Sequence, residues 1–253
     1  MKFTKIQGAG NDFILIDDRA ALFSLGESEI KRLCHRHFGI GADGLILLQT
    51  DSGLRMRIFN SDGREAESCG NGLRCLGRFL LELGFAAKNR PIRVGDRTVE
   101  LSYIGDKIGV DMGEPKNLCL HIATERGIVH FVDTGVPHLV HFVKDLEPLP
   151  IQELAPFWRH HPRFAPQGAN VNFAAVEEGR IRVRTFERGV EGETLACGTG
   201  ACAVAVVAHA VHSMPSPLLL SFAGGDLEIQ IEQNRLVMVG PAIKVFEGVI
   251  EIF

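Results

Sequence analysis

The sequence predicts an α+β fold of two pseudo-symmetric repeats, each a curved, mostly antiparallel sheet wrapped around a central helix. Three observations lead to this prediction. The two halves of the chain repeat one another, alternating apolar and polar residues mark many half-buried strands, and each half contains one strongly apolar helix. We expect the active site to lie in the cleft between the two repeats.

The duplication is visible in residue pairs at one constant separation. Three anchor pairs are each 127 positions apart: Gly8 and Gly135, Gly41 and Gly168, Arg57 and Arg184. The segments Cys69-Gly-Asn-Gly72 and Cys197-Gly-Thr-Gly200 are 128 apart, so one residue is inserted between Phe186 and Cys197. Two domains of ordinary size follow.

The predicted N-terminal repeat spans residues 1–116 and carries Cys69, and the C-terminal repeat spans 117–253 and carries Cys197. The hinge is expected near Gly113-Glu-Pro115. We expect about ten residues at the C-terminus to pack back on the N-terminal domain.

The elements follow from local patterns. Period-2 alternation predicts half-buried antiparallel strands around residues 99–103, 181–183 and 227–231. Residues 28–38 are expected to form a surface helix ended by Gly39. Leucines from position 73 to 83 give a second helix an apolar stripe, and Gly84 marks its end. The helix at 201–211 is apolar nearly all round and should be buried.

Composition excludes several classes of protein. The chain is 45% hydrophobic and 23% charged with a net charge of −4, which gives no case for a nucleic-acid or membrane partner. The start lacks the apolar stretch of a secretory signal, and the longest apolar segment, residues 201–208, is too short to span a bilayer. Six cysteines without a Cys-x-x-Cys pair favour a reducing, cytoplasmic setting.

Two cysteines are candidates for chemistry. Cys69 and Cys197 each precede a helix start, where the helix dipole and unpaired N–H groups are expected to lower a thiol pKa. The glycines that follow leave these N–H groups open to an anion such as a carboxylate. Four cysteines are expected to be structural: Cys34, Cys75, Cys119 and Cys202. The spacings Cys69-x5-Cys75 and Cys197-x4-Cys202 miss the common zinc-ligand patterns, and no lysine lies in a recognisable pyridoxal phosphate site, so no cofactor is expected.

The repeat makes polar residues equivalent without making them identical. Asn11 corresponds to His138, and Asn60 corresponds to Glu187. Asn170, Asn172 and Arg188 belong to the same loops. Glu187 and His138 are placed to tune a thiol pKa, and Arg188 is placed to bind a carboxylate. Arg64 and Arg74, near the first motif, are expected to be solvated.

Two such thiols imply a reaction. One thiolate removes a proton from a carbon next to the bound carboxylate, and the opposing thiol delivers a proton to the other face. The result is a two-base racemisation, and enclosure from water supports it because the proton is weakly acidic.

At these residues the chain resembles the diaminopimelate epimerases, which are independent of pyridoxal phosphate. The matching segments are Gly8-Ala-Gly-Asn-Asp-Phe13, Phe59-Asn-Ser-Asp-Gly63, Glu67-Ser-Cys-Gly-Asn-Gly72, Gly135-Val-Pro-His138, Gly168-Ala-Asn170, Glu187-Arg-Gly189 and Ala196-Cys-Gly-Thr-Gly-Ala201. The resemblance implies conversion of LL- to meso-diaminopimelate by the acid–base pair Cys69 and Cys197, in a homodimer.

The resemblance also implies that His138 and Glu187 tune the thiols. It implies that the substrate is contacted by Asn11, Asn60, Gly70, Asn71, Asn170, Glu187, Arg188, Gly198 and Thr199. Gly44 and Val136 depart from the pattern of many members, which have glutamine and asparagine there.

Other hypotheses stay open at this point. A racemase or epimerase of another amino acid, or of a broader set, would turn over a monocarboxylic amino acid. A thiol redox sensor would use a switchable disulfide between Cys69 and Cys197. A duplicated binding protein would have no catalysis.

Overall fold

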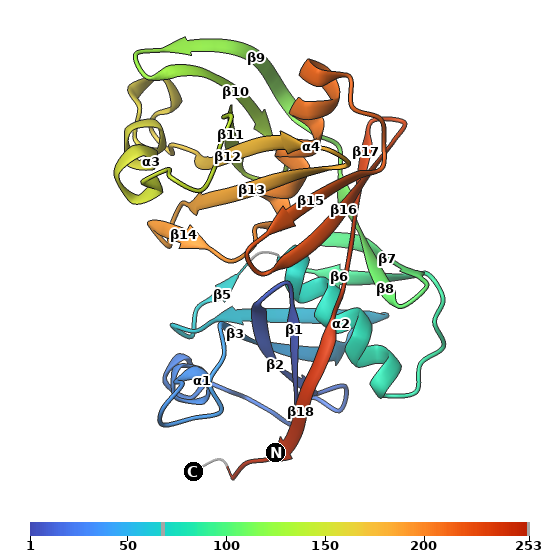
Figure 1. The fold of residues 1–253 in the computed structure, drawn as a ribbon. Coiled ribbons are helices and arrows are strands. Elements are labelled where there is room, and N and C mark those ends of the chain that lie inside the picture. The colour runs from blue at the N-terminus through green and yellow to red at the C-terminus, as the bar shows by residue number, and fades with distance from the viewer. Residues whose placement is uncertain (67–68, 252–253) are drawn as a thin grey trace. The chain divides into compact units, whose positions relative to one another are not determined.

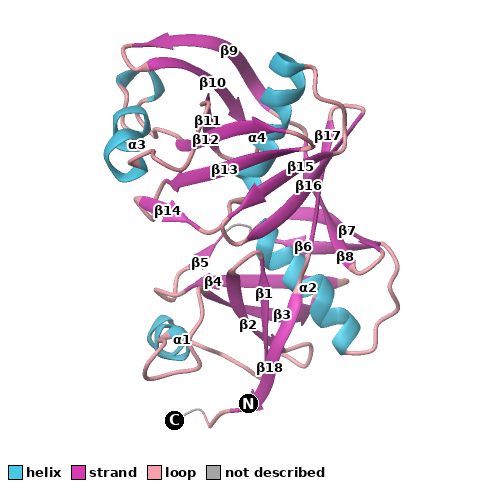
Figure 2. Ribbon diagram, viewed as in Figure 1, coloured by secondary structure: helices cyan, strands magenta, loops and turns pink. Residues whose placement is uncertain are grey.

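The computed structural model describes residues 1–66 and 69–251. The chain forms two compact units, one made of residues 1–110 with 240–253 and the other of residues 111–239. Figure 1 labels the elements of both units and Figure 2 shows that strands predominate in each. The α+β class predicted from the sequence is confirmed.

The first unit is built from strands around one long helix. Its elements are β1 (Lys2–Gly8), β2 (Asn11–Asp17), α1 (Glu27–Cys34), β3 (Gly44–Thr50), β4 (Leu54–Asn60), β5 (Glu65–Ala66), α2 (Gly70–Glu82), β6 (Arg90–Val94), β7 (Arg97–Ile104), β8 (Lys107–Gly113) and β18 (Ile243–Val249).

The second unit repeats this order of elements. They are β9 (Lys116–Thr124), β10 (Gly127–Asp133), β11 (Pro137–Phe142), α3 (Ile151–Arg159), a short 3₁₀ helix (Pro162–Phe164), β12 (Asn170–Glu177), β13 (Arg180–Glu187), β14 (Gly192–Thr194), α4 (Gly198–His212), β15 (Leu218–Phe222), β16 (Gly225–Glu232) and β17 (Arg235–Gly240).

The strand pairings of the two units match one for one. β2 pairs with β3 in parallel and β3 with β4 antiparallel, as β11 does with β12 and β12 with β13. β4 and β13 each pair with a short antiparallel strand and with a parallel neighbour. The remaining pairings are antiparallel in both units.

The last strand of each repeat joins the sheet of the other unit. β9 follows β8 in sequence but pairs with β10 of the second unit, and β18 follows β17 but pairs with β1 of the first. β9 begins at Lys116 and β18 at Ile243, which are again 127 positions apart. The C-terminal segment thus completes the sheet of the first unit, beside β1 (Figure 1).

A central helix packs on one face of each sheet. α2 contacts β1, β2, β3, β7 and β18, and α4 contacts β10, β11, β12, β13, β15 and β16. Residues 200–208 of α4 are all buried, as expected for a helix that is apolar all round. Gly84 follows α2 with φ +84°, the left-handed conformation that ends helices and suits glycine.

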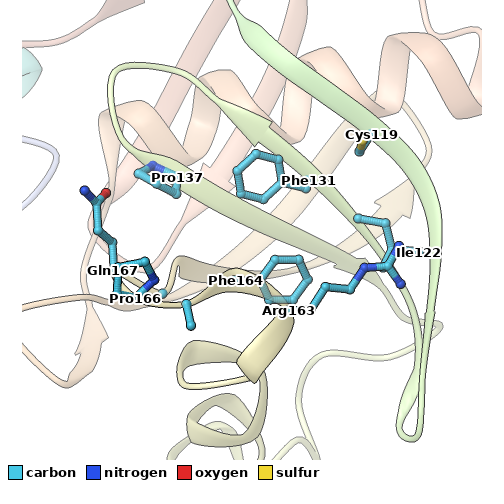
Figure 3. A pocket seen from close by; sticks show the side chains of 10 residues that line it. Cys119, Ile122, Phe131, Pro137, Arg163, Phe164, Pro166 and Gln167 are labelled. Carbon is cyan, nitrogen blue, oxygen red and sulfur yellow. The ribbon is translucent and has the colours of Figure 1, made fainter.

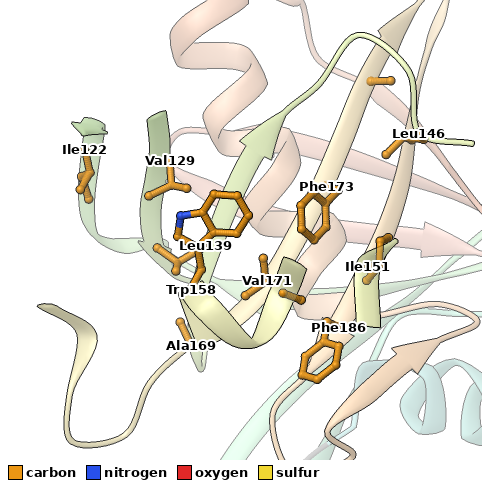
Figure 4. Close-up of a cluster of buried hydrophobic side chains, with 12 residues drawn as sticks. Ile122, Val129, Leu139, Leu146, Ile151, Trp158, Ala169, Val171, Phe173 and Phe186 are labelled. Carbon is orange, nitrogen blue, oxygen red and sulfur yellow. The ribbon is translucent and has the colours of Figure 1, made fainter. Parts of the chain in front are cut away.

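A second layer covers the other sheet face. In the first unit Ile30 and Leu33 of α1 pack against Ile14 and Leu45. In the second unit Trp158 of α3 packs among Val171, Phe173 and other buried side chains, which Figure 4 shows as one cluster. Because both faces are covered, the middle residues of β2 and β3 are buried without alternation.

Two expectations about the first unit are wrong. The surface helix ends at Cys34 rather than Phe38, because the His35 imidazole accepts hydrogen bonds from the backbone N–H groups of His37 and Phe38. Arg74 is fully buried rather than solvated, whereas Arg64 is exposed as expected. The Arg74 guanidinium donates to the Pro241 carbonyl and lies against Gly8, where any side chain would take its space.

Among the described residues, no helix is long and apolar enough to cross a membrane.

Candidate active site

Cys69 and Cys197 occupy the same structural position in the two units. Each is the N-cap of the central helix, with extended backbone, and each sulfur accepts a hydrogen bond from the N–H group three residues on, at 3.4 Å. N-cap side chains normally satisfy such N–H groups with oxygen. The sequence prediction that both thiols stand at helix N-termini is therefore confirmed.

Two amide side chains lie beside Cys69. The Cys69 sulfur is 3.8 Å from Asn11 Oδ1, and the Asn71 amide donates to the same oxygen at 3.4 Å. Asn11 is turned this way by Asp43, whose carboxylate accepts from Asn11 Nδ2 at 2.9 Å. Since Nδ2 is engaged by Asp43, the amide oxygen is the atom that faces the thiol.

A charged cluster fixes Asp43 in turn. Arg36 donates to both Asp12 and Asp43, and the buried Lys5 ammonium lies 2.9 Å from Asp12. Burial opposes ionisation of Asp12, but the hydrogen bonds from Arg36 and Lys5 outweigh it and hold the pKa of Asp12 well below its usual range. The side chain that orients Asn11 therefore belongs to a hydrogen-bonded network with Arg36, Asp12 and Lys5.

The surroundings of Cys197 are different, because a carboxylate stands beside it. Glu187 is hydrogen-bonded to the Cys197 thiol and also accepts from the Thr194 hydroxyl at 2.5 Å. Thr199 Oγ1 lies 3.5 Å from the sulfur. The position equivalent to Glu187 is Asn60 in the first unit, so the two repeats differ here in having an amide in one and a carboxylate in the other.

The expectation of a lowered thiol pKa is wrong for Cys197. Burial and the negative charge of Glu187 raise the pKa of Cys197 well above its ordinary value, and the helix N-terminus does not compensate. Burial also raises the pKa of Glu187. Cys197 therefore rests as a protonated thiol beside the Glu187 carboxyl group.

His138 is fully buried in a frame of amides. Asn172 Nδ2 lies 3.1 Å from its Nδ1 and Asn170 Nδ2 lies 3.3 Å from its Nε2. Burial, together with the charge of Arg188, lowers the pKa of His138 to about 3. Two amide donors facing the two ring nitrogens leave no acceptor for a second ring proton, so the imidazole is neutral. Whether this neutral ring tunes Cys197 stays a prediction.

The loop after β13 carries Arg188 and contains the inserted residue. In the first unit three residues, 61–63, connect Asn60 to Arg64, whose backbones are hydrogen-bonded. In the second unit four residues, 188–191, connect Glu187 to its strand partner Gly192. Matching Arg–Glu pairs at the base of both loops, Arg57 with Glu65 and Arg184 with Glu193, confirm the register.

Within the second unit the predicted residues form one connected group. Asn170 Oδ1 accepts from the backbone N–H of Arg188 at 2.7 Å, which links the Arg188 loop to Asn170 and, through it, to His138. Cys197, Glu187 and Thr199 adjoin one another, and Gly198 begins α4.

In the first unit Cys69, Asn11 and Asn71 are in contact at the start of α2, where Gly70 is the first residue. Asn60 is exposed at the end of β4 and pairs in the strand register with Gly44. A side chain at Gly44 would collide with the Phe59 carbonyl, 2.5 Å from its Cβ. Residues Glu67 and Ser68 of the first matching motif lie outside the described residues.

Sequence reasoning missed several residues that hold the site together. Asp43, Thr194 and Thr185 were not singled out, although Thr185 donates to Asn172 at 2.9 Å and so fixes the amide that faces His138. Asp43 stands two residues after Gly41, one of the repeat anchors. That adjacency was the available signal.

One cavity of the second unit is lined by neither thiol. It measures about 350 Å³ and is walled by Phe131, Phe164 and Arg163, with Pro137 and Gln167 at one side (Figure 3). Cys119 also lines it and is exposed, so the expectation that this cysteine is a buried structural residue is wrong. Among the described residues, no group of three His, Cys, Asp or Glu side chains is placed to hold a metal ion.

Comparisons with known proteins agree with this geometry. The family model of diaminopimelate epimerase matches residues 3–118 and 130–245, one segment in each repeat. The chain is 39% identical to a diaminopimelate epimerase of Archaeoglobus fulgidus, over 99% of this chain and 96% of that protein. It is 40% identical to one of Synechocystis, over 100% and 99%. The chain belongs to the diaminopimelate epimerase family.

Solved structures extend the similarity of the fold beyond this epimerase family. A phenazine biosynthesis protein of the PhzF family from Bacillus anthracis superposes with a TM-score of 0.78 at 14% identity, covering 100% of this chain and 99% of that one. A hydroxyproline epimerase from Agrobacterium vitis superposes with a TM-score of 0.65 at 16% identity, covering 98% and 91%. At such low identity these likenesses concern the fold alone.

Proposed function

We propose that this protein is a diaminopimelate epimerase that interconverts LL- and meso-2,6-diaminopimelate by a two-base mechanism without a cofactor. The observation that carries the proposal is the pair of equivalent N-cap thiols, Cys69 and Cys197, in a chain of this family. The mechanism requires both thiols to reach opposite faces of one α-carbon.

In the proposed reaction one cysteine, as thiolate, removes the α-proton and becomes a thiol. The other cysteine, as thiol, donates its proton to the opposite face of the carbanion and becomes a thiolate. One C–H bond breaks, one C–H bond forms, and the stereocentre inverts. The two sulfurs end in exchanged protonation states and return to their starting states through solvent.

The asymmetric surroundings give the two thiols different roles in each direction. Glu187 accepts the proton of Cys197 when that sulfur must act as a base, because both groups have raised pKa values and share a hydrogen bond. Cys69 faces the Asn11 amide oxygen instead, which holds its S–H without adding charge. His138 is proposed to tune Cys197 as a neutral ring.

Substrate binding is assigned to the helix starts and loops. N–H groups at the N-termini of α2 and α4 suit the carboxylate at the reacting carbon. These contacts are proposed for Gly70, Asn71, Gly198 and Thr199, with Asn11 beside them. Polar groups away from the helix starts are proposed to bind the far end: Asn60, Asn170, Glu187 and Arg188.

We also propose the domain limits 1–116 and 117–253 for the two repeats, with the C-terminal segment packed on the first. The two matched segments of the family model and the pairing of β18 with β1 support them. A homodimer is proposed, supported by exposed apolar residues on β18, among them Val245 and Val249. Six cysteines outside any disulfide support a cytoplasmic setting.

The test is epimerisation of LL-diaminopimelate by purified protein, followed by chiral chromatography. Cys69→Ala and Cys197→Ala are each expected to reduce kcat at least about 1,000-fold, because the reaction then lacks one of its two bases. The matched control is Cys119→Ala, an exposed thiol away from the helix starts, which should keep the wild-type rate.

Undiminished turnover in either helix-start variant would disprove the acid–base assignment. Including monocarboxylic amino acids in the same assay tests the substrate: comparable turnover of lysine would replace diaminopimelate epimerisation by a broader racemase activity.

A further inference from the structure

The Arg188 loop, residues 188–191, is one residue longer than the corresponding loop of the first repeat, and the two loops pack on their units through different contacts. In the first unit the shorter loop has Gly63 packed directly on α1, where a Cβ would lie 2.3 Å from the Glu27 carbonyl. In the second unit the longer loop is joined to α3 by an ion pair between Arg159 and Glu191.

Glu191 is the centre of the loop's hydrogen bonds. Its Oε1 accepts from Arg159 Nη2 at 2.8 Å, from Arg159 Nε at 3.1 Å and from the backbone N–H of Gly189 at 3.1 Å. Its own N–H donates to the Glu187 carbonyl at 2.8 Å. The Glu191 carboxylate therefore links the loop to α3 and also accepts a hydrogen bond from within the loop.

The backbone at Glu191 supports a role for this side chain. Its φ is +52°, in the left-handed region, where a residue other than glycine is strained. Glycine would relieve that strain but would remove the carboxylate that Arg159 and Gly189 bind. The conformation is maintained by those hydrogen bonds.

Arg159 is a rigid anchor for this contact. Its side chain is 11% exposed, against 44% for Glu191. It also donates from Nη1 to the Gln167 carbonyl at 3.2 Å. Gly168 leaves room for it, because a Cβ there would lie 2.2 Å from the Arg159 guanidinium.

The loop presents a free cation. No hydrogen bond or ion pair within the described part of the chain uses the Arg188 guanidinium, whereas its backbone N–H is held by Asn170. The loop is thus fixed at both ends, by Asn170 at Arg188 and by Arg159 at Glu191.

We infer that Arg159 and Glu191 are positioning residues that hold the Arg188 loop in the conformation that binds the distal carboxylate of the substrate. The inference rests on the proposed function. A residue that positions a binding group changes KM more than kcat, because the reacting carbon and the two thiols are untouched.

The test uses Glu191→Gln, Arg159→Gln and the double variant. Each is expected to raise KM for LL-diaminopimelate about ten-fold with kcat within about two-fold, and to weaken inhibition by pimelate by a similar factor. The double variant should lose less than the sum of the two single losses, because the Arg159–Glu191 ion pair is already absent from each single variant. The control is Glu177→Gln, which breaks an exposed pair with Arg180 in the same unit and should change nothing.

Hydrogen exchange of the amides at residues 188–191, measured without substrate, separates this inference from the proposed function. Faster exchange in all three variants, but not in the control, supports the positioning role. If the wild-type protein does not turn over diaminopimelate, that result refutes the proposed function alone and leaves the exchange result valid. Unchanged exchange, additive effects in the double variant, or a loss confined to kcat would overturn the inference.

Discussion

Single residues in this protein differ from their ordinary behaviour because of what surrounds them. His138 is neutral because it is buried and faces two amide donors, and Cys197 is protonated because it is buried beside Glu187. Asn11 presents its oxygen to Cys69 because Asp43 holds its nitrogen. In each case the neighbouring side chains set the protonation state or the orientation of the group.

The buried histidine makes a prediction for stability. The pKa of His138 is about 3 in the folded protein against about 6.5 in the unfolded chain. Between these values the unfolded chain takes up a proton that the folded protein refuses. The contribution of neutral His138 is therefore complete above pH 6.5 and is lost as pH falls towards 3, at ~1.4 kcal/mol per pH unit.

Urea unfolding from pH 7 to pH 4 measures this effect. In His138→Gln the decline of the unfolding free energy with falling pH should be shallower by one proton. The matched control is His37→Gln, an exposed histidine of the first unit, whose slope is compared with that of His138→Gln. Parallel curves for the wild type and His138→Gln would contradict a buried neutral imidazole.

At the scale of the elements, each Cys-Gly-x-Gly motif serves packing as well as chemistry. The last glycine lets the helix approach the sheet: a Cβ at Gly200 would lie 2.5 Å from Asn172 Oδ1, and one at Gly72 would lie 2.9 Å from Ile58. Asn172 in turn faces His138. The start of α4 therefore packs against Asn172, one of the two amides that contact His138.

Gly200→Ala tests this connection. We expect it to lower the unfolding free energy by about 1–3 kcal/mol through overpacking, and to lower kcat because Asn172 is displaced. Gly192→Ala is the matched control, since the nearest atom to its Cβ would be 3.7 Å away. Denaturant unfolding and the epimerase assay report the two effects. Wild-type values for Gly200→Ala would mean that α4 has room to move.

The elements were largely predictable from sequence because their signals are local. The apolar stripe of α2, its glycine stop and the alternation in β7, β13 and β16 lie within short windows, and the structure confirms them. The end of α1 was missed because the His35 side chain caps it. Arg74 was misplaced because its burial depends on Gly8 and Pro241, which are distant in sequence.

The residues of the candidate site could also be predicted from the sequence, but their electrostatics could not. A repeat at one separation was enough to identify the equivalent thiols and the residues Asn11, His138, Asn60 and Glu187. Their electrostatics could not be obtained from spacing, because the raised pKa of Cys197 depends on burial. The supporting residues Asp43, Arg159 and Glu191 act through side-chain contacts that no periodicity shows.

At the scale of the whole molecule, the two repeats share their backbone architecture but differ in the side chains beside the thiols. Strand pairings, helix N-caps and the Arg–Glu pairs at the loop bases are equivalent in the two units. The side chains beside the thiols are not: an amide faces Cys69 and a carboxylate faces Cys197. We expect such a molecule to exchange protons symmetrically while it recognises a substrate with two unlike ends.

The central claim is that two different groups handle the two protons. It is tested by converting LL-diaminopimelate in heavy water and stopping the reaction at low conversion. We expect the meso product to carry deuterium at the inverted carbon while the remaining LL substrate is still unlabelled, because the proton is removed by one sulfur and deuterium is delivered by the other. Product that retains the original hydrogen would show that a single base serves both faces, and would contradict the account.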